Sequence, residues 1–405
     1  MDSDIIFKII ESSHFNFLIG SGASKNYLST LYNIEQLLAS LENESAVSHQ
    51  EVWYKVLNVS IKHWYYTKCI KGNLKLIDKN FNNEEQVAFD ETNDNYSNFL
   101  QALNVLLLKR RNKLLPKEVN IFTTNIDIFL DYNLDRLGLE FNDGFSGKFY
   151  QTFNTSNYQK SYYTNSSQYS VSAELPLFNL FKLHGSLTWD KTSETEIRYN
   201  ADLEVLRSLN KIEIPSNYLI PLSENNVSKT FSEIKKQAES IASEFGDHSA
   251  LDGFSAEYEN LIMINPTKEK FENTTLRLEY YEQMRMFSNI LERENSVLFV
   301  TGFSFADEHI RQITYRALNS NPTLLVIIFN FSENGKLRVE KMFEPLKYKN
   351  LHTDFVGYDF KKVTEDCFLP LAEKFNRNNK VESNGDEISN SNPKSGETLD
   401  AKQVN

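Results

Sequence analysis

The sequence predicts an α/β fold in which a parallel β-sheet carries helices on both faces. Short apolar runs rich in Phe, Val, Ile and Leu alternate with segments of helical periodicity, which is typical of buried parallel strands. Several of these runs also end in glycines or polar residues, as strands of open α/β sheets do where ligands bind. With 405 residues, of which 40% are apolar, the chain is long enough for two or three structural units.

The first predicted strand covers residues 14–19 and closes in a glycine turn. A helix is expected from about Ser24, because serine is a frequent N-cap and apolar residues follow at roughly helical spacing. Helical patterns continue to about residue 117, apart from the polar, turn-rich stretch 80–95, which predicts a loop. This block interrupts the α/β alternation, so residues 30–117 are interpreted as a helical insertion.

Strand-like runs return after the insertion and alternate with helical segments. The predicted strands are 119–124, 179–183, 259–264, 296–303 and 323–331, and the predicted helices are 127–138, 276–292 and 306–318. Residues 152–172, rich in Ser, Asn, Tyr and Thr, predict a loop or an irregular hairpin. Residues 376–405 contain almost no large apolar side chain, so we expect a disordered acidic and polar tail.

Composition argues against several classes of protein. The chain has 43 basic and 55 acidic residues, a net charge of -12, so direct binding to nucleic acid is not expected. Its two cysteines, Cys69 and Cys367, are too few for a four-cysteine zinc site, and we expect buried or indifferent thiols and no metal. The N-terminus lacks the order of a signal peptide, and no apolar run is long enough to cross a bilayer. We therefore expect a soluble, cytoplasmic protein that does not bind membranes.

Four turns at predicted strand ends carry the residues that point to function. Because the carboxyl ends of parallel strands meet at one edge of a sheet, the four turns outline one site. They are GSGAS at 20–24, TTNID at 123–127, HG at 184–185 and GFSFAD at 302–307. In the first turn, Gly20 and Gly22 allow a phosphate to approach the backbone closely, although a tight turn without a ligand explains them equally well.

The second and third turns supply candidate catalytic groups. Asn125 and Asp127 are helix caps on one hypothesis, which is the usual role of these residue types. On the other hypothesis Asn125 is a neutral hydrogen-bonding group that holds a water or a ribose hydroxyl. His184 follows an apolar run and precedes Gly185, and it is the strongest acid–base candidate because the pKa of histidine lies near ~6.5.

The last turn and the strand after it add polar groups at the same edge. Ser304, next to Gly302, can donate to a phosphate or a ribose, whereas Asp307 is expected to cap the following helix. Asn330 ends the run LLVIIF and is equally able to be a turn residue.

The ordered set GSGAS, TTNID, LHGS and TGFSFAD resembles the catalytic domain of the sirtuin family, which carries Gly-Ala-Gly, Thr-x-Asn-Ile-Asp, His-Gly and Gly-x-Ser elements. The resemblance implies a Rossmann-like domain, over residues 1–29 and 118–375, that binds NAD+ and cleaves its nicotinamide–ribose bond. It implies that Asn125 positions the attacking water and the ribose, and that His184 acts as a base near the ribose hydroxyls. The remaining residues would bind the dinucleotide: Gly20, Gly22, Ala23 and Ser24 at the pyrophosphate, Ile126 and Asp127 at the nicotinamide amide, Gly302 and Ser304 at the ribose–phosphate side, and Asn330 at the adenosine ribose.

Two departures from the sirtuin deacylases narrow the expected function. Those enzymes carry a four-cysteine zinc module, and they follow the first turn with Gly-Ile-Pro-Asp-Phe-Arg, where this chain has residues 25–28 as KNYL. Protein deacylation is therefore the least expected activity. The helical insertion is similar to that of sirtuin-like NADase subunits of bacterial antiphage defence systems, which commonly form large oligomers and are often paired with a HerA-type ATPase.

That resemblance implies hydrolysis of NAD+ to nicotinamide and ADP-ribose as a defence effector, a homo-oligomer and a HerA-type ATPase partner. The alternative is a subunit without catalytic activity, which binds NAD+ or ADP-ribose as a sensor or serves as a scaffold, and so controls a partner ATPase.

Overall fold

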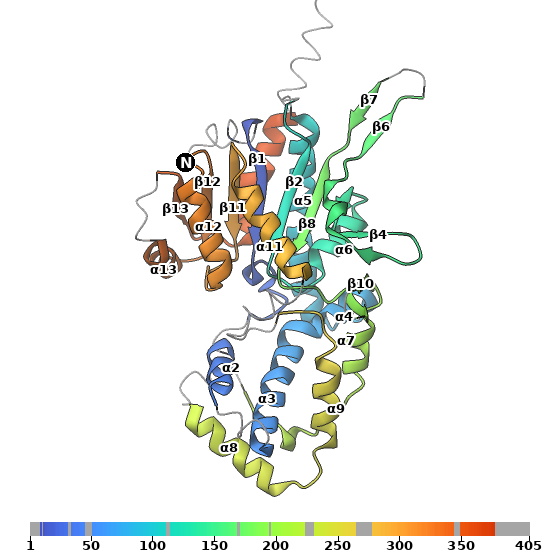
Figure 1. The fold of residues 1–405 in the computed structure, drawn as a ribbon, viewed down its shortest axis with the longest axis vertical. Helices are drawn as coiled ribbons and strands as arrows, with labels where there is room; N and C mark the ends of the chain where they lie inside the picture. Colours follow the sequence, from blue (N-terminus) through green and yellow to red (C-terminus); the bar gives the residue numbers. More distant parts are fainter. Residues whose placement is uncertain are drawn as a thin grey trace, which may run out of the picture.

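A computed structural model describes residues 9, 11–30, 34–44, 51–110, 114–167, 171–193, 196–222, 231–264, 278–343 and 349–376. Within these residues, the central sheet has seven parallel strands in the order β13-β12-β11-β1-β2-β8-β3 (Figure 1). The strands are β1 (His14–Ile19), β2 (Glu118–Thr123), β3 (Phe141–Asn142), β8 (Leu177–Lys182), β11 (Ser296–Thr301), β12 (Leu325–Asn330) and β13 (Leu351–Val356). The predicted α/β fold with a parallel sheet is confirmed.

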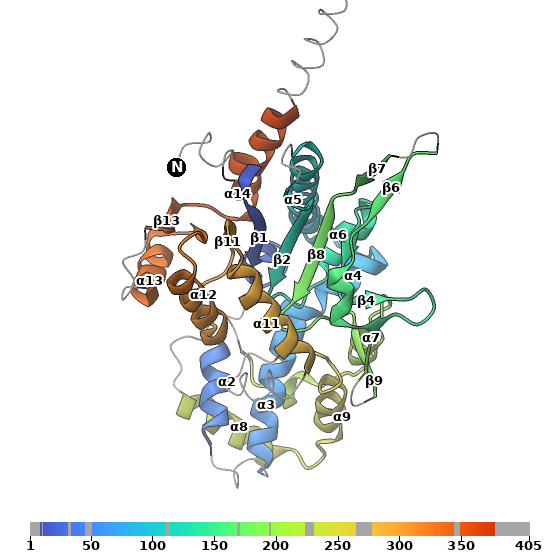
Figure 2. The same cartoon turned by 45° about the horizontal axis from the view of Figure 1, so that its top comes forward.

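Helices cover both faces of the sheet, as predicted (Figure 2). On one face, the ring of Phe17 lies 5.1 Å from Phe99 of α5 (Asn83–Lys109) and 5.3 Å from Phe368 of the π-helix η7 (Thr364–Phe368). On the other face, the ring of Phe122 lies 4.7 Å from Phe287 of α11 (Leu278–Leu291), and α12 (Glu308–Ser320) buries its apolar side there. Each face thus has its own apolar cluster, which is why these strands carry apolar residues on both faces.

Helix α5 occupies most of the stretch 80–95 that predicts a loop, so that prediction is wrong. Its N-terminus is a capping box, in which the Asn82 side chain accepts from the Glu85 N–H and the Glu85 carboxylate accepts from the Asn82 N–H. Phe89 and Tyr96, two turns apart, are buried on one side of the helix. The polar composition therefore reflects an exposed helix face and a cap.

A group of helices, here called the helical unit, lies beyond the carboxyl ends of the strands (Figure 1). Its central helix, α3 (Val52–Tyr65), packs against helices from two distant parts of the sequence. These helices are α2 (Ile34–Glu42), α8 (Phe231–Glu244) and α9 (Ser249–Tyr258), and α7 (Glu204–Leu209) packs on α9. The range 30–117 was predicted as one insertion. In the structure its helices α2 and α3 belong to the helical unit, whereas α5 packs on the sheet.

Two other predicted elements are wrong in the structure. The run 259–264 forms only an isolated bridge between Met263 and Gly185 and no strand of the sheet. The helix expected from Ser24 is replaced by a four-residue 3-10 helix, η1 (Ser21–Ser24), and the next described helix is α2. The Ser24 hydroxyl does not cap a helix, because it binds Asp127 and Tyr96 instead. The outer strands β3 and β13 were not predicted from the sequence, since β3 is very short and three polar residues, 352–354, occupy the middle of β13.

A row of buried asparagines crosses four adjacent strands, here called the asparagine ladder. Asn120 donates to Asn16, Asn179 donates to Asn120, and Asn142 donates to Asn179, at distances of 2.9–3.1 Å. The four residues are in register in β1, β2, β8 and β3. Because these bonds between amides form only in this register, the ladder favours this pairing of the strands.

Smaller elements surround this framework. Residues 152–172 include β5 (Thr152–Phe153) and β6 (Tyr163–Asn165), and β6 pairs with β7 (Ser172–Glu174), which agrees with the predicted irregular hairpin. Both cysteines are buried, as expected, and they form no disulfide within the described residues. No helix in the described ranges has the length and apolarity needed to cross a membrane. The tail predicted for 376–405 lies, apart from residue 376, outside the described residues.

Candidate functional site

The first and fourth turns pack against each other through their backbones. The Gly20 N–H donates to the Thr301 carbonyl and the Gly22 N–H donates to the Gly302 carbonyl, both at 3.0 Å. A Cβ added to Gly20 would lie 2.4 Å from the Gly302 oxygen, and Gly302 itself has a φ of 63°. The contact between the two turns therefore explains these glycines without any ligand. The N–H groups of Gly20 and Gly22 thus already donate to carbonyls of the protein.

Ser24 and Asp127, predicted to bind different parts of a dinucleotide, are hydrogen-bonded to each other. The Ser24 hydroxyl donates to Asp127 Oδ2 at 2.8 Å and lies 2.9 Å from the hydroxyl of Tyr96 on α5. Asp127 Oδ1 accepts from the Phe129 N–H at the start of α6 (Phe129–Arg136). Burial raises the pKa of Asp127, and the nearby Lys182 charge opposes this shift. The two turns are thus joined by a buried polar network that includes Tyr96, which the sequence did not indicate.

Asn125 differs from every other predicted site residue in lacking partners. Its side chain is buried, with 5% exposed, and neither amide atom has a hydrogen-bond partner among the described residues. Burial raises the pKa of the Tyr96 hydroxyl well above its ordinary value, and the polar interaction of that hydroxyl with the Asn125 side chain lowers it. A buried amide without partners costs about 1–3 kcal/mol, so the position is suited to a water or a ligand that supplies the missing bonds.

His184 forms a pair with a carboxylate from the fourth turn. Its Nε2 lies 3.0 Å from Asp307 Oδ2, while Asp307 Oδ1 accepts from the N–H groups of His309 and Ile310. Asp307 is therefore the predicted helix cap and, in addition, the residue that orients the histidine. A carboxylate on one imidazole nitrogen fixes the orientation of the ring, as it does for the histidine of a catalytic triad.

The run 259–264 holds the histidine turn in place. The Ile264 N–H donates to the His184 carbonyl, and the Ser186 N–H donates to the Ile262 carbonyl. Gly185 has a φ of 84°, and a Cβ there would lie 2.2 Å from the Ile262 oxygen. The run predicted as a sheet strand thus packs directly on the third turn, and this packing requires glycine after His184.

The second and third turns lie side by side. Strands β2 and β8 are neighbours, with Thr123 opposite Lys182, and the Leu187 N–H donates to the Ile126 carbonyl at 3.1 Å. His184 follows β8 and Asp307 lies after β11, and β1 and β2 lie between these two strands in the sheet. The contact between His184 and Asp307 therefore spans the ends of β1 and β2. The predicted catalytic residues and the glycine turns are therefore collected at one edge of the sheet.

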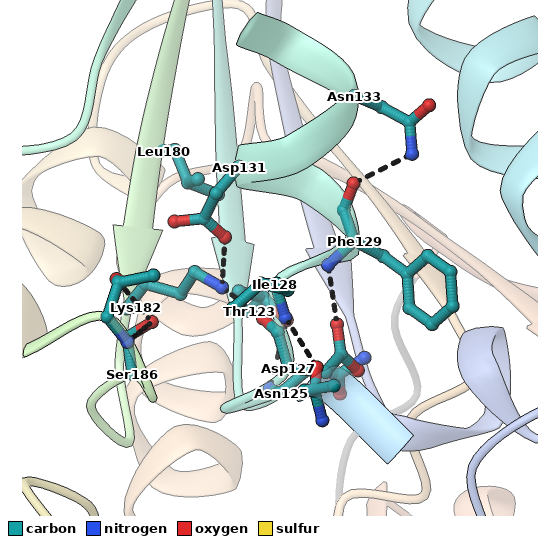
Figure 3. Close-up of polar contacts among 12 residues, drawn as sticks. Thr123, Asn125, Asp127, Ile128, Phe129, Asp131, Asn133, Leu180, Lys182 and Ser186 are labelled. Carbon is teal, nitrogen blue, oxygen red and sulfur yellow. Dashed lines mark hydrogen bonds and ion pairs between the residues drawn. The ribbon is translucent and has the colours of Figure 1, made fainter. Parts of the chain in front are cut away.

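Lys182, a charged residue in the apolar run NLFKL, lies under the second turn (Figure 3). Its Nζ donates to the Asp127 carbonyl at 2.5 Å and lies 2.6 Å from Asp131 Oδ2 on α6. A lysine is almost never fully buried unless paired, so its position in an apolar strand could have marked it from the sequence.

The remaining predicted residues have different surroundings. Ala23 and Ile126 are buried, whereas Gly302 and Ser304 are exposed, and the Ser304 hydroxyl accepts from the Ala306 N–H. Asn330 is buried, and its amide donates to the Thr353 carbonyl at 2.8 Å. Its nitrogen thus ties β12 to β13.

A separate acidic cavity of about 380 Å³ lies beside α6. Asp131, Asp135 and Asp143 contribute to its wall, and none of the residues predicted for the site lines it. Burial raises the pKa of Asp143 to about 6. Asp131, the partner of Lys182, is one of the residues that connect this cavity to the site.

Comparison with known protein families and with curated proteins finds no match to this chain. Its function is therefore inferred from the residues of the site.

Proposed function

We propose that the protein hydrolyses NAD+ to nicotinamide and ADP-ribose at the site formed by the four turns. The observation that carries this proposal is the Asn125 amide, which is buried just past the end of a central strand and makes no hydrogen bond with the described residues. An amide there can hold a water and a ribose hydroxyl without competing for the proton. The ordered resemblance of the four turns to the sirtuin family supplies the chemical class.

In this proposal the attacking water lies between Asn125 and His184. The water oxygen forms a bond to C1′ of the ribose, the bond between C1′ and the pyridinium nitrogen breaks, and nicotinamide leaves as a neutral molecule with the electron pair. His184 takes the proton of the water, and Asp307 stabilises the resulting imidazolium. Most of the remaining barrier is met by orientation and by exclusion of bulk water.

The strand order supports one direction for the dinucleotide. Asn330 is the last residue of β12, Gly302 and Ser304 follow β11, the first glycine turn follows β1, and Asn125 follows β2. This is the order of adenosine ribose, phosphates and nicotinamide ribose along NAD+. The ends of β12 and β8 are separated by four strand spacings, or about 19 Å, so the molecule would bind in an extended form.

The wider biological setting is part of the same proposal and rests on the resemblance alone. We expect the protein to deplete NAD+ as the effector of an antiphage defence complex, as a homo-oligomer with a HerA-type ATPase partner. Because uncontrolled loss of NAD+ would harm the host, the isolated chain is expected to be weak or gated until that partner is present.

The test measures nicotinamide and ADP-ribose released from NAD+ by the purified chain, alone and with the proposed HerA-type ATPase partner. Asn125→Ala and His184→Ala are expected to abolish release. Asn125→Ala should leave the free energy of unfolding unchanged or raise it by about 1 kcal/mol, because it removes an unsatisfied buried amide.

The matched control is Asn319→Ala, which truncates an exposed asparagine on α12 and should retain full release. Release that persists in both site variants would overturn the assignment of residues. NAD+ that binds and is not consumed under either condition would instead favour the sensing or scaffold function.

A further inference from the structure

The ammonium of Lys182 is among the most deeply buried charges of the described residues, with 2% of the side chain exposed. It belongs to β8, two residues before His184, and it contacts the second turn and α6 at once (Figure 3). One contact is the ion pair with Asp131, which neutralises the charge. The other is a hydrogen bond to the main-chain carbonyl of Asp127, at the end of the turn that begins with Asn125.

Stability alone does not account for this arrangement. A buried ion pair gains little over well-packed apolar side chains, because both charges lose their hydration. An apolar residue at position 182 would fill the same space, but it would leave the Asp127 carbonyl without its donor. The specific effect of the lysine is therefore on the geometry of the turn.

We propose that Lys182 is a positioning residue, which holds the Asn125–Ile126–Asp127 turn at a fixed distance from His184. The turn is attached to β8 at both ends: the Leu183 N–H donates to the Thr123 carbonyl, and Lys182 holds the Asp127 carbonyl. Asn125, whose own side chain makes no hydrogen bond with the described residues, is placed by the main-chain bonds of this turn. Besides the two attachments to β8, these are its own N–H to Thr123 Oγ1 and the Leu187 N–H to the Ile126 carbonyl.

The kinetic consequence of this proposal rests on the proposed function. Displacing a catalytic group lowers kcat more than it weakens substrate binding. A displacement of about 1 Å lowers the rate roughly a hundredfold. Loss of the lysine is therefore expected to lower kcat by about ten- to a hundredfold, with KM changed less than about threefold.

The decisive variant is the double substitution Lys182→Met with Asp131→Asn. It keeps the sizes of both side chains and removes both charges, so no unpaired charge remains buried. We expect its thermal midpoint to lie close to that of the unmodified chain, its kcat to fall as stated, and amide hydrogen exchange in residues 124–129 to become at least about tenfold faster. The matched control, Lys55→Met with Asp252→Asn, removes a 2.6 Å ion pair between α3 and α9 and should change none of the three.

A second variant, Asp131→Asn alone, leaves the bond from Lys182 to Asp127 in place and serves if the double variant does not fold. It removes the paired carboxylate, but those of Asp127 and Asp143 still interact with the ammonium, so we expect it to fold with a lower thermal midpoint. It should retain kcat within about threefold and the exchange rates of residues 124–129. Unchanged kcat and exchange in the double variant, or an equal loss in Asp131→Asn, would overturn the proposal. If the unmodified chain cleaves no NAD+, the proposed function fails, while the exchange of residues 124–129 still decides whether Lys182 holds the turn.

Discussion

Asp307 is the residue whose role changes most between sequence and structure. In the sequence it is a helix cap, and in the structure its second carboxylate oxygen also binds His184, 123 residues away. Each oxygen has a separate partner, so the two roles can be tested separately.

Asp307→Asn should separate the capping of α12 from the contact with His184. The remaining side-chain oxygen can still cap α12, so the thermal midpoint should change little. The amide cannot stabilise an imidazolium, so nicotinamide release should fall by about a hundredfold or more. Thermal unfolding checks the expected midpoint, and steady-state kinetics check the expected loss of nicotinamide release. A variant with full turnover would show that His184 does not need the carboxylate. Asp307→Ala, which also loses the cap, should cost about 1 kcal/mol of stability in addition.

Asp143, in the wall of the acidic cavity, gives a prediction on pH. Burial raises its pKa to about 6 in the native protein, whereas an unfolded aspartate has a pKa near ~3.9. The native state therefore holds the proton more tightly, so this group lowers stability as the pH rises through that window. Asp143→Asn should raise the free energy of unfolding at pH 7 by on the order of 2 kcal/mol.

The gain from Asp143→Asn should shrink as the pH is lowered towards 4, where the native carboxyl is protonated. Urea unfolding at pH 7, 6, 5 and 4.5 measures this trend. The amide oxygen can still accept from the Phe145 N–H, as the carboxylate does at 2.9 Å. A variant less stable than the original chain at pH 7 would contradict the prediction.

At the scale of elements, the asparagine ladder links four neighbouring strands, β1, β2, β8 and β3, through hydrogen bonds between their side chains. Asn120 is the central member, because it donates to Asn16 and accepts from Asn179. The apolar residues of the strands favour burial, but they do not by themselves select one neighbour or register.

Asn120→Leu should destabilise the protein by about 3 kcal/mol or more, because it leaves two buried amides each short of a partner. Chemical denaturation measures this loss. The same substitution at Asn43, whose amide bonds the Ala39 carbonyl at the exposed end of α2, should cost less than about 0.5 kcal/mol. Equal effects at the two positions would show that the ladder adds nothing to stability.

At the scale of the whole molecule, the site joins the ends of five strands, and a ligand bound across them should stabilise the entire sheet. His184→Ala, which is expected not to consume NAD+, is the form in which to measure this. NAD+ at a hundred times its Kd should raise the free energy of unfolding by about 2.7 kcal/mol, with a matching rise in Tm. The control is nicotinamide alone, which reaches only the ends of β2 and β8 in the proposed direction and should raise Tm less. No shift at any NAD+ concentration would contradict binding at this edge.

Much of the fold could be predicted from short-range patterns. The inner strands are apolar along their length because both faces of the sheet are covered, so β1, β2, β8, β11 and β12 are evident as runs. The same patterns misidentify 259–264, whose apolar side chains are buried against the histidine turn without joining the sheet. They also miss the N-terminal half of α5, since its capping box and polar face have a loop-like composition.

The sequence by itself determined the α/β class, the strand ends that carry the site, and the chemical types of the residues there. Only the tertiary structure decided which of those residues contact each other. In the structure, His184 pairs with Asp307, and the N–H groups of Gly20 and Gly22 donate to the strand β11 and the turn after it. The Asn125 amide makes no hydrogen bond with the described residues, and Lys182 donates to the Asp127 carbonyl of the same turn. The physical reason is that strand periodicity is a local property, whereas these contacts join residues from four strands whose order in the sheet differs from their order in the chain.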